Sequence, residues 1–172
     1  MGKVIALPVK KTRARSRTWS LSVFQQRAHH SQMTIQAACV SLTSDYKYLK
    51  RKKRGDYQQY SKVLQKVREL RHQTNCWSET MYDNERLPFL GRVLRYPLLS
   101  VCYHAQQRAD ELIALLMEIC IAYSTGTPLI EEARMHQDII RALTELLKIE
   151  KEVSFEITAM LDQIYFRVST TS

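Results

Sequence analysis

The chain has 172 residues, a net charge of +9 and a pI near 9.5. Its 4 Gly and 4 Pro are too few for a turn-rich β-sandwich or a disordered chain, so the composition favours helices. Residues 1–104 carry 20 Lys and Arg against 6 Asp and Glu, and residues 105–172 carry 6 against 11, so an attraction for polyanions belongs to the first half.

Residues 1–17 are predicted to be a flexible basic arm. They contain Pro8, six positive charges and no helical periodicity. Residues 1–44 carry seven Lys and Arg and no acid, which also fits a mitochondrial presequence, and that alternative stays open.

A long amphipathic helix is predicted from Ser20. Its apolar residues recur at steps of three and four between Leu21 and Leu42, which places them on one helical face. The helix is expected to run through the basic segment and to end at Gly55, because glycine suits the left-handed position just beyond a helix end.

Asp56 is expected to cap a second helix. An inward-facing apolar stripe in this helix begins with Tyr57 and Tyr60. Its outer side is predicted to be basic, through Lys62, Lys66 and Arg68.

Residues 75–97 are predicted to be a loop with at most a short helix, because they mix polar capping residues with two prolines and a glycine. The aromatic side chains of this loop are expected to cover the ends of the bundle. They are Trp77, Tyr82 and Phe89.

A third amphipathic helix is predicted from Pro97 to Tyr123. Thr127 and Pro128 are expected to begin a fourth, which a heptad-like stripe carries to Val168. A helix of about 40 residues is about 60 Å long, and this length favours pairing with a helix of another chain. Its acidic residues are interpreted as a solvated side: Glu131, Glu132, Glu145, Glu150, Glu152 and Glu156.

These elements predict an all-α fold, an antiparallel bundle of three to four long helices with a flexible basic N-terminal arm. Residues 18–172 are assigned to a single helical-bundle domain. In length, basicity and helical layout the chain is similar to the small bundle proteins that assist retroelement reverse transcriptases. This likeness rests on no motif and assigns no role to an individual residue.

The segment KYLKRKKRGDYQQY, residues 47–60, places six Lys and Arg within eight positions. Charges this crowded are stabilised by an anionic neighbour, and each phosphate that they neutralise also releases a condensed counterion. A basic arm can contact other phosphates while a folded body docks. The predicted nucleic-acid-binding residues are Lys10, Lys11, Arg13, Arg15, Arg17, Lys47, Lys50, Arg51, Lys52, Lys53, Arg54, Lys62 and Lys66.

The same basic features have other interpretations. The run at 47–54 also fits a solvated helix end that meets an acidic protein, or a nuclear import signal. The arm also fits a disordered tail.

No motif for catalysis or a cofactor stands out. The sequence has no phosphate-binding glycine loop, no Gly-x-Ser-x-Gly and no His-Glu-x-x-His. Helical spacing spreads His136, Asp138 and Glu145 over a face. His72 and Cys76 are one helical turn apart but lack the second pair of ligands that a zinc site needs. We expect no enzyme, no cofactor and no metal.

The four cysteines are scattered, which favours free thiols in a reducing intracellular compartment such as the cytoplasm, the nucleoid or the nucleus. The longest apolar stretch, residues 112–123, is too short to span a membrane and contains Glu118, so we expect no membrane partner.

The resulting hypothesis is a non-enzymatic bundle that binds DNA or RNA phosphate without reading sequence, as an accessory or scaffold protein. The long C-terminal helix is expected to mediate self-association or to contact a protein partner. The alternative is a protein-interaction subunit of a larger complex that uses this helix, with the basic run as an import signal or as a contact for an acidic partner.

Overall fold

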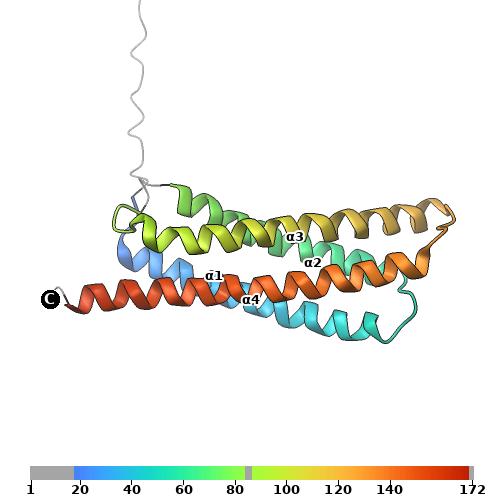
Figure 1. Ribbon diagram of the computed structural model, residues 1–172, viewed down its shortest axis with the longest axis horizontal. Helices are drawn as coiled ribbons and strands as arrows, with labels where there is room; N and C mark the ends of the chain where they lie inside the picture. Colours follow the sequence, from blue (N-terminus) through green and yellow to red (C-terminus); the bar gives the residue numbers. More distant parts are fainter. Residues whose placement is uncertain (1–17, 84–86, 171–172) are drawn as a thin grey trace, which may run out of the picture.

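The computed structural model describes residues 18–83 and 87–170, with side chains to Phe166. Within these ranges there are four helices and no strand. The helices are α1 (Leu21–Lys50), α2 (Tyr57–Tyr82), α3 (Arg92–Thr125) and α4 (Glu132–Thr170). Figure 1 shows them side by side, each reversing the direction of the one before it. The predicted all-α bundle of long helices is therefore confirmed, whereas the predicted arm, residues 1–17, lies outside the described residues.

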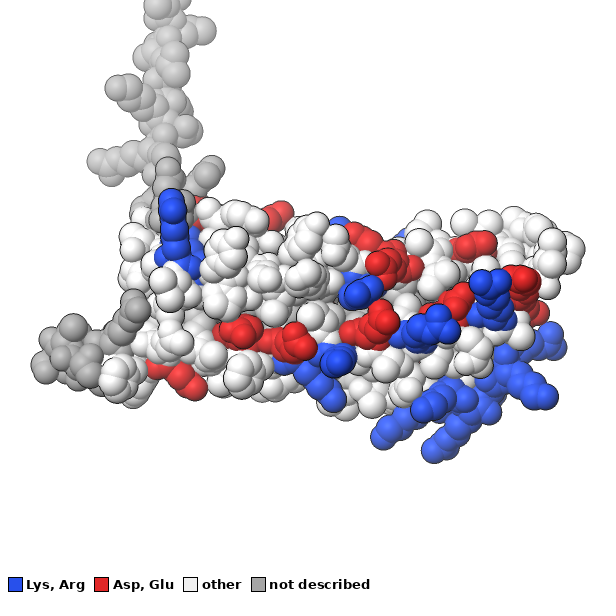
Figure 2. All heavy atoms as spheres, in the orientation of Figure 1, with Lys and Arg blue, Asp and Glu red and all other residues white. Residues whose placement is uncertain are grey.

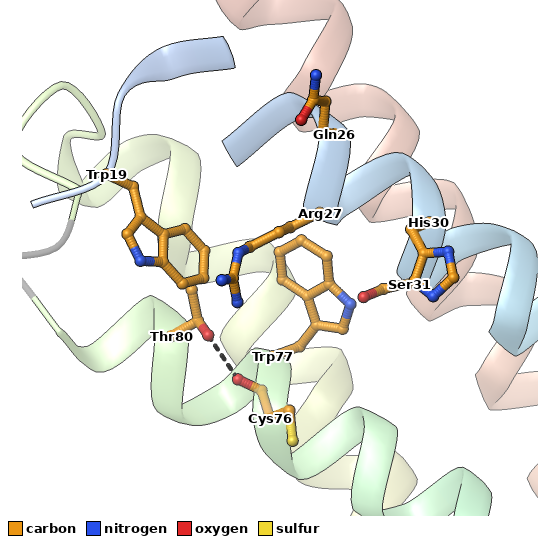
Figure 3. A pocket seen from close by; sticks show the side chains of 8 residues that line it. All are labelled: Trp19, Gln26, Arg27, His30, Ser31, Cys76, Trp77 and Thr80. Atoms are coloured by element: carbon orange, nitrogen blue, oxygen red, sulfur yellow. Dashed lines mark hydrogen bonds between the residues drawn. The ribbon is translucent and has the colours of Figure 1, made fainter. Parts of the chain in front are cut away.

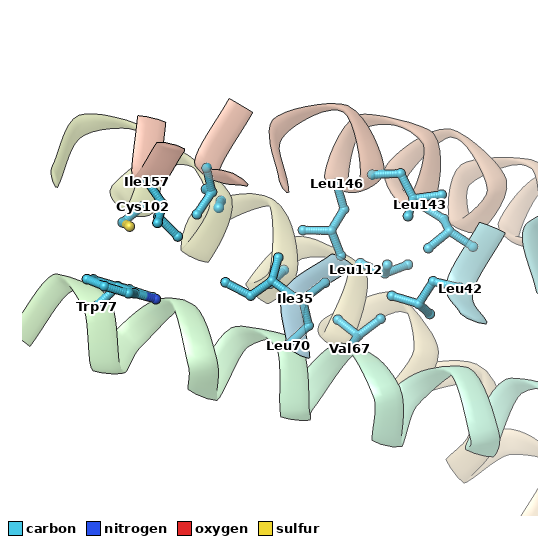
Figure 4. Close-up of a cluster of buried hydrophobic side chains, with 14 of the residues drawn as sticks. Ile35, Leu42, Val67, Leu70, Trp77, Cys102, Leu112, Leu143, Leu146 and Ile157 are labelled. Carbon is cyan, nitrogen blue, oxygen red and sulfur yellow. The ribbon is translucent and has the colours of Figure 1, made fainter. Parts of the chain in front are cut away.

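The helices pack as a ring, in which α2 contacts α3, α3 contacts α4, α4 contacts α1 and α1 contacts α2. The contact between α1 and α2 is the least extensive of the four. The helices enclose one apolar core, and Figure 4 shows Leu42, Val67, Leu112 and Leu143 meeting there, one from each helix. Each such side chain contributes about 1.5–3 kcal/mol by leaving water.

The end of α1 differs from the prediction. The helix ends at Lys50 with Arg51 as its C-cap, so the four cations that follow Lys50 lie in the connection to α2. Gly55 is not left-handed, because Gly126 is the only described residue with a positive φ. Gly55 is needed for space instead: a Cβ there would lie 2.8 Å from Tyr60 Cζ and 3.1 Å from Leu49 Cδ2.

The start of α2 confirms the predicted cap. The Asp56 carboxylate accepts from the Gln59 amide at 2.9 Å, and the Gln59 side chain accepts from the Asp56 amide at 3.1 Å. This reciprocal pair satisfies two amides that would otherwise have no partner. The predicted stripe is correct for Tyr60, which is buried, and wrong for Tyr57, which is 47% exposed.

The predicted loop at 75–97 is mostly wrong, because α2 continues to Tyr82 and α3 begins at Arg92. Trp77 is buried and meets Phe24 edge to face at 6.1 Å, so its burial extends the apolar stripe of α2. Phe89 also covers Phe24, with the ring centroids 5.7 Å apart, but Tyr82 is 72% exposed.

Arg95, which sequence reasoning did not single out, closes this end of the bundle. Its buried guanidinium donates to the carbonyls of Leu90 at 2.8 Å and Met81 at 2.9 Å, and also to that of Leu87. The side chain thus satisfies carbonyls at the end of α2 and in the α2–α3 connection. Pro97 lies inside α3 rather than at its start, where it was predicted.

The start of α4 also differs from the prediction. The helix begins at Glu132, not at Thr127. The amide of Thr127 instead donates to Ala122 O at 3.0 Å, beside Gly126 in the left-handed conformation, so Thr127 helps to close α3. No helix among the described residues is long and apolar enough to cross a membrane.

Candidate nucleic-acid interface

Six cations project from the last turn of α1 and from the connection that leads to α2. We call Lys47, Lys50, Arg51, Lys52, Lys53 and Arg54 together the basic loop, and all six are exposed. Figure 2 shows Lys and Arg gathered at the end of the bundle where α1 leads into α2, whereas acidic and basic side chains alternate along α4. The predicted residues of this segment therefore form one surface patch.

Most of this positive charge has no carboxylate beside it. Among the described residues, Arg54 is the one cation of the basic loop in an ion pair, with Glu132 at 3.9 Å. Lys52 lies 4.3 Å from the Tyr48 ring centroid and Lys50 lies 5.6 Å from that of Tyr46. Aromatic rings orient these ammonium groups without neutralising them.

The two predicted cations of α2 have different surroundings. Lys62 is exposed and forms no ion pair with a described residue. Lys66 lies 2.5 Å from the carboxylate of Asp45, and this ion pair joins α2 to α1. Lys62 therefore extends the patch of the basic loop, whereas Lys66 is largely neutralised.

A buried histidine of α4 holds the backbone of the basic loop. His136 has no exposed surface, and its Nε2 lies 3.0 Å from Leu49 O and 2.9 Å from Lys52 O. Because both partners are carbonyl oxygens, Nε2 carries the hydrogen. His136 thus donates to carbonyl groups at the end of α1, where the regular hydrogen-bond pattern of the helix stops.

Tyr60 completes this anchor. Its hydroxyl lies 2.6 Å from His136 Nδ1 and accepts from the Gly55 amide at 2.8 Å. Because the Tyr60 hydroxyl accepts from the Gly55 amide, its own hydrogen is directed to His136 Nδ1, the acceptor within reach. Burial raises the pKa of Tyr60, which keeps the hydroxyl in the neutral form that this arrangement requires.

The remaining contacts of the anchor come from α3 and the start of α4. The Tyr123 ring stacks on Tyr60 with centroids 6.0 Å apart, and its hydroxyl donates to the carboxylate of Glu132. Burial is the main reason that the pKa of Tyr123 is raised. The anchor, Tyr60, Tyr123 and His136, therefore takes one residue from each of three helices to hold the turn after α1.

Sequence reasoning placed Tyr60 on an apolar stripe and treated His136 as one of three side chains that do not converge, and so missed their joint role. The carbonyl partners of His136, on Lys52 and Leu49, lie 84 and 87 residues from it along the chain. A polar residue at a core position was the available signal, because a buried imidazole needs partners for both nitrogens. The arm residues Lys10, Lys11, Arg13, Arg15 and Arg17 lie outside the described residues.

The candidate catalytic side chains do not converge, whereas His72 Nε2 and Cys76 Sγ lie 3.7 Å apart. His136 belongs to the anchor, Asp138 faces Arg141 at 3.5 Å and Glu145 faces Arg108 at 3.3 Å. The described residues contain no group of three or more His, Cys, Asp and Glu that could hold a metal ion. All four cysteines are free.

Comparison with known proteins finds no matching family, no similar curated protein and no similar solved structure.

Proposed function

We propose that the protein binds nucleic-acid phosphate without reading base sequence and acts as a non-enzymatic accessory or scaffold. The observation that supports this most directly is the basic loop, in which five of six exposed cations have no ion pair with a described residue. Lys62 adds a further exposed charge beside it.

The physical mechanism is counterion release. Each phosphate that meets a cation releases part of its condensed counterion. As a result, the logarithm of the binding constant falls by about 0.7 to 0.9 for each contact when the logarithm of the salt concentration rises by one. Five or six contacts give a slope of about −4 to −5. Because the anchor already orders the backbone of the turn, binding loses less conformational entropy than it would with a loose loop.

The experiment is a salt titration of binding to random-sequence DNA and RNA, read by fluorescence anisotropy. The test variant replaces Lys50, Arg51, Lys52, Lys53 and Arg54 with Gln. The control removes the same charge elsewhere through Arg92, Arg134, Arg141, Lys148 and Lys151, all exposed and none in the patch. We expect the slope of log binding constant against log salt to become less steep, by about 4 in the test variant and by less than about 1 in the control.

Equal effects of the two variants would show that net charge alone drives association. Absence of binding by the unmodified protein at low salt would exclude the function.

A second candidate is a protein-interaction subunit that uses α4. Phe155, Tyr165 and Phe166 are each 69–70% exposed on this helix, and exposed aromatic side chains mark contact surfaces more often than other surface residues do. The predicted partner is a second copy or another protein. Sedimentation at increasing concentration tests self-association: we expect a mass above that of one chain for the unmodified protein and a monomer when these residues are replaced by Ser.

A further inference from the structure

The seam between α1 and α2 is hollowed along its length. Three hollows of about 330, 400 and 340 Å³ follow one another, each lined by residues of these two helices, and the first also by Trp19 just before α1. Their positions follow the antiparallel pairing, since the first lies by Arg27 and Trp77 and the third by Tyr48 and Lys62. The seam thus leads from the basic loop to the opposite end of α1.

The first hollow, which we call the tryptophan pocket, holds both tryptophans of the chain. Figure 3 shows the Arg27 side chain reaching between Trp19 and Trp77. The Arg27 guanidinium lies over the Trp19 ring, 4.5 Å from its centroid. Arg27 makes no hydrogen bond or ion pair with a described residue, and no Asp or Glu is among the described residues that line the pocket. The Trp19 ring therefore orients the Arg27 guanidinium, which has no anionic partner among the described residues.

Trp77 adds a buried hydrogen-bond donor. The side chain is 4% exposed, and its Nε1 has no hydrogen-bond partner among the described residues. Figure 3 shows this nitrogen on the side of the ring that faces Ser31, another lining residue. Because buried indole N–H groups normally find a partner, the pocket offers a hydrogen-bond donor that no described residue uses.

These features match the chemistry of a nucleotide. A guanidinium that lies over an indole ring offers donors to phosphate and a planar group to a base, and unpaired bases stack on aromatic rings and on arginine side chains. In a duplex the base faces are already stacked on neighbouring base pairs. A pocket of this kind therefore distinguishes single strands from duplexes.

The pocket and the basic loop lie on one path. Arg27 precedes Lys50 by 23 positions on α1, which corresponds to about 35 Å. Arg68 lines the middle hollow and Lys62 lines the third, so cations occur between the two ends. The carboxylates on this path are Glu69 and Asp45, and Asp45 is already paired with Lys66.

We propose that the α1–α2 seam is the path of a single-stranded nucleic acid, with the strand's backbone on the basic loop and an unpaired base stacked at Trp19 and Arg27 in the tryptophan pocket. This inference rests on the proposed function and specifies its ligand as single-stranded.

The first test compares single-stranded oligothymidylate with a duplex of the same length. Trp19→Ala is expected to weaken binding of the single strand roughly tenfold and to leave duplex binding unchanged, because one stacking contact is lost. Trp19→Phe should restore most of the affinity. Tyr96→Ala, which removes an aromatic ring that is 74% exposed on α3, is the matched control and should change neither affinity. Thermal unfolding checks that each variant folds.

Arg27 separates stacking from charge. Arg27→Lys keeps the charge but not the plane, so the salt slope is expected to stay while the affinity for the single strand falls. Arg27→Gln should lower both.

The second test reads the pocket directly. Trp77→Phe leaves Trp19 as the sole tryptophan, and its fluorescence is expected to be quenched by oligothymidylate. An abasic oligonucleotide, which keeps the phosphates, and inorganic phosphate should leave the emission unchanged.

Three results would overturn the inference: an abasic strand that quenches as strongly as oligothymidylate, a Trp19→Ala variant with unchanged single-strand affinity, or a polyglutamate peptide that binds as tightly as the oligonucleotide. The first two leave the proposed function intact if the basic-loop variant still loses its salt slope. Failure of the unmodified protein to bind either nucleic acid would instead remove the proposed function itself.

Discussion

Glu150 was expected on the solvated acidic side of the last helix, but it has no exposed surface. The Thr74 hydroxyl donates to its Oε1 at 3.0 Å, and its Oε2 has no partner among the described residues. Burial raises the pKa of this carboxyl to about 7, because the charged form loses its hydration, and the Thr74 hydrogen bond only partly opposes this. Glu150 is thus an acid whose protonated form suits the core.

This burial predicts a pH-dependent stability. Between pH 4.5 and about 7 the unfolded chain releases the Glu150 proton while the folded chain keeps it, so stability falls as the pH rises through this window. The full decrease is on the order of 3 kcal/mol. Glu150→Gln is expected to flatten the profile and to raise the free energy of unfolding at pH 8 by about 1–3 kcal/mol. Urea unfolding at several pH values measures both effects.

Glu145→Gln is the matched control, since Glu145 is exposed one turn earlier on the same helix. An equal response of the two variants would argue that the carboxyl group of Glu150 is hydrated in solution.

Gly55 gives a second prediction at the scale of one residue. Gly55→Ala places a methyl carbon 2.8 Å from Tyr60 Cζ, and the Tyr60 ring is itself fully buried, so one of the two must move. We expect a loss of about 1–3 kcal/mol in the free energy of unfolding, as for other overpacked sites. Gly91→Ala, where an added Cβ meets nothing within 4 Å, should have a smaller effect. Chemical denaturation distinguishes them, and similar losses at both sites would contradict the close packing at Gly55.

At the scale of elements, α4 determines how α1 ends. His136 donates to the carbonyls of Leu49 and Lys52, and the Leu49 carbonyl also accepts from the Lys52 amide at 3.1 Å. The turn after α1 therefore has an ordered backbone, while its side chains remain exposed. The charge of the basic loop comes from its own side chains, whereas the order of its backbone depends on His136. Substitutions can therefore change the charge and the order separately.

His136→Ala is expected to lower the free energy of unfolding by about 2–4 kcal/mol through a lost side chain and lost hydrogen bonds. It should also weaken nucleic-acid binding while leaving the salt slope unchanged, because the cations remain but the turn must order on binding. The Gly55 amide donates a hydrogen bond to the Tyr60 hydroxyl, and faster hydrogen exchange at this amide would report the loosened turn.

Gln137→Ala, at an exposed neighbour, serves as the control for this experiment. Unchanged affinity of the folded His136→Ala protein would show that order in the turn does not contribute to binding.

At the scale of the whole molecule, charge is divided between two pairs of helices. Residues 18–83, which contain α1 and α2, carry 11 Lys and Arg against 5 Asp and Glu, and residues 87–170, which contain α3 and α4, carry 8 against 11. Ion pairs within the second pair, such as Arg108 with Glu145, further balance its charge. The side of the molecule formed by α1 and α2 is therefore the one that favours contact with a polyanion.

This division predicts a footprint. Bound nucleic acid is expected to protect Lys50, Lys52, Lys53 and Lys62 from acylation, while Lys148 and Lys151 on α4 stay reactive, because the proposed interface puts the phosphates against the α1–α2 half. Mass spectrometry of the modified protein measures each lysine. Equal protection of both groups would contradict binding on one side.

Much of the architecture follows from local sequence. Periodic apolar residues predict long helices that must bury a stripe, and the Asp56 cap follows from side chains that lie three positions apart. The crowding of the basic loop is likewise visible in eight consecutive positions. The sequence by itself therefore determined the helical class, the start of α2 and the location of the strongest positive charge.

Tertiary structure decided what depends on distant partners. Gly55 is constrained by the Tyr60 ring and not by its own φ, Glu150 is buried because neighbouring helices cover it, and the basic loop is held by a histidine more than 80 residues away. The tryptophan pocket likewise exists because antiparallel packing brings the start of α1 to the end of α2. Periodicity shows which face of a helix is buried, but only packing shows which side chains meet there, and these contacts place the candidate site.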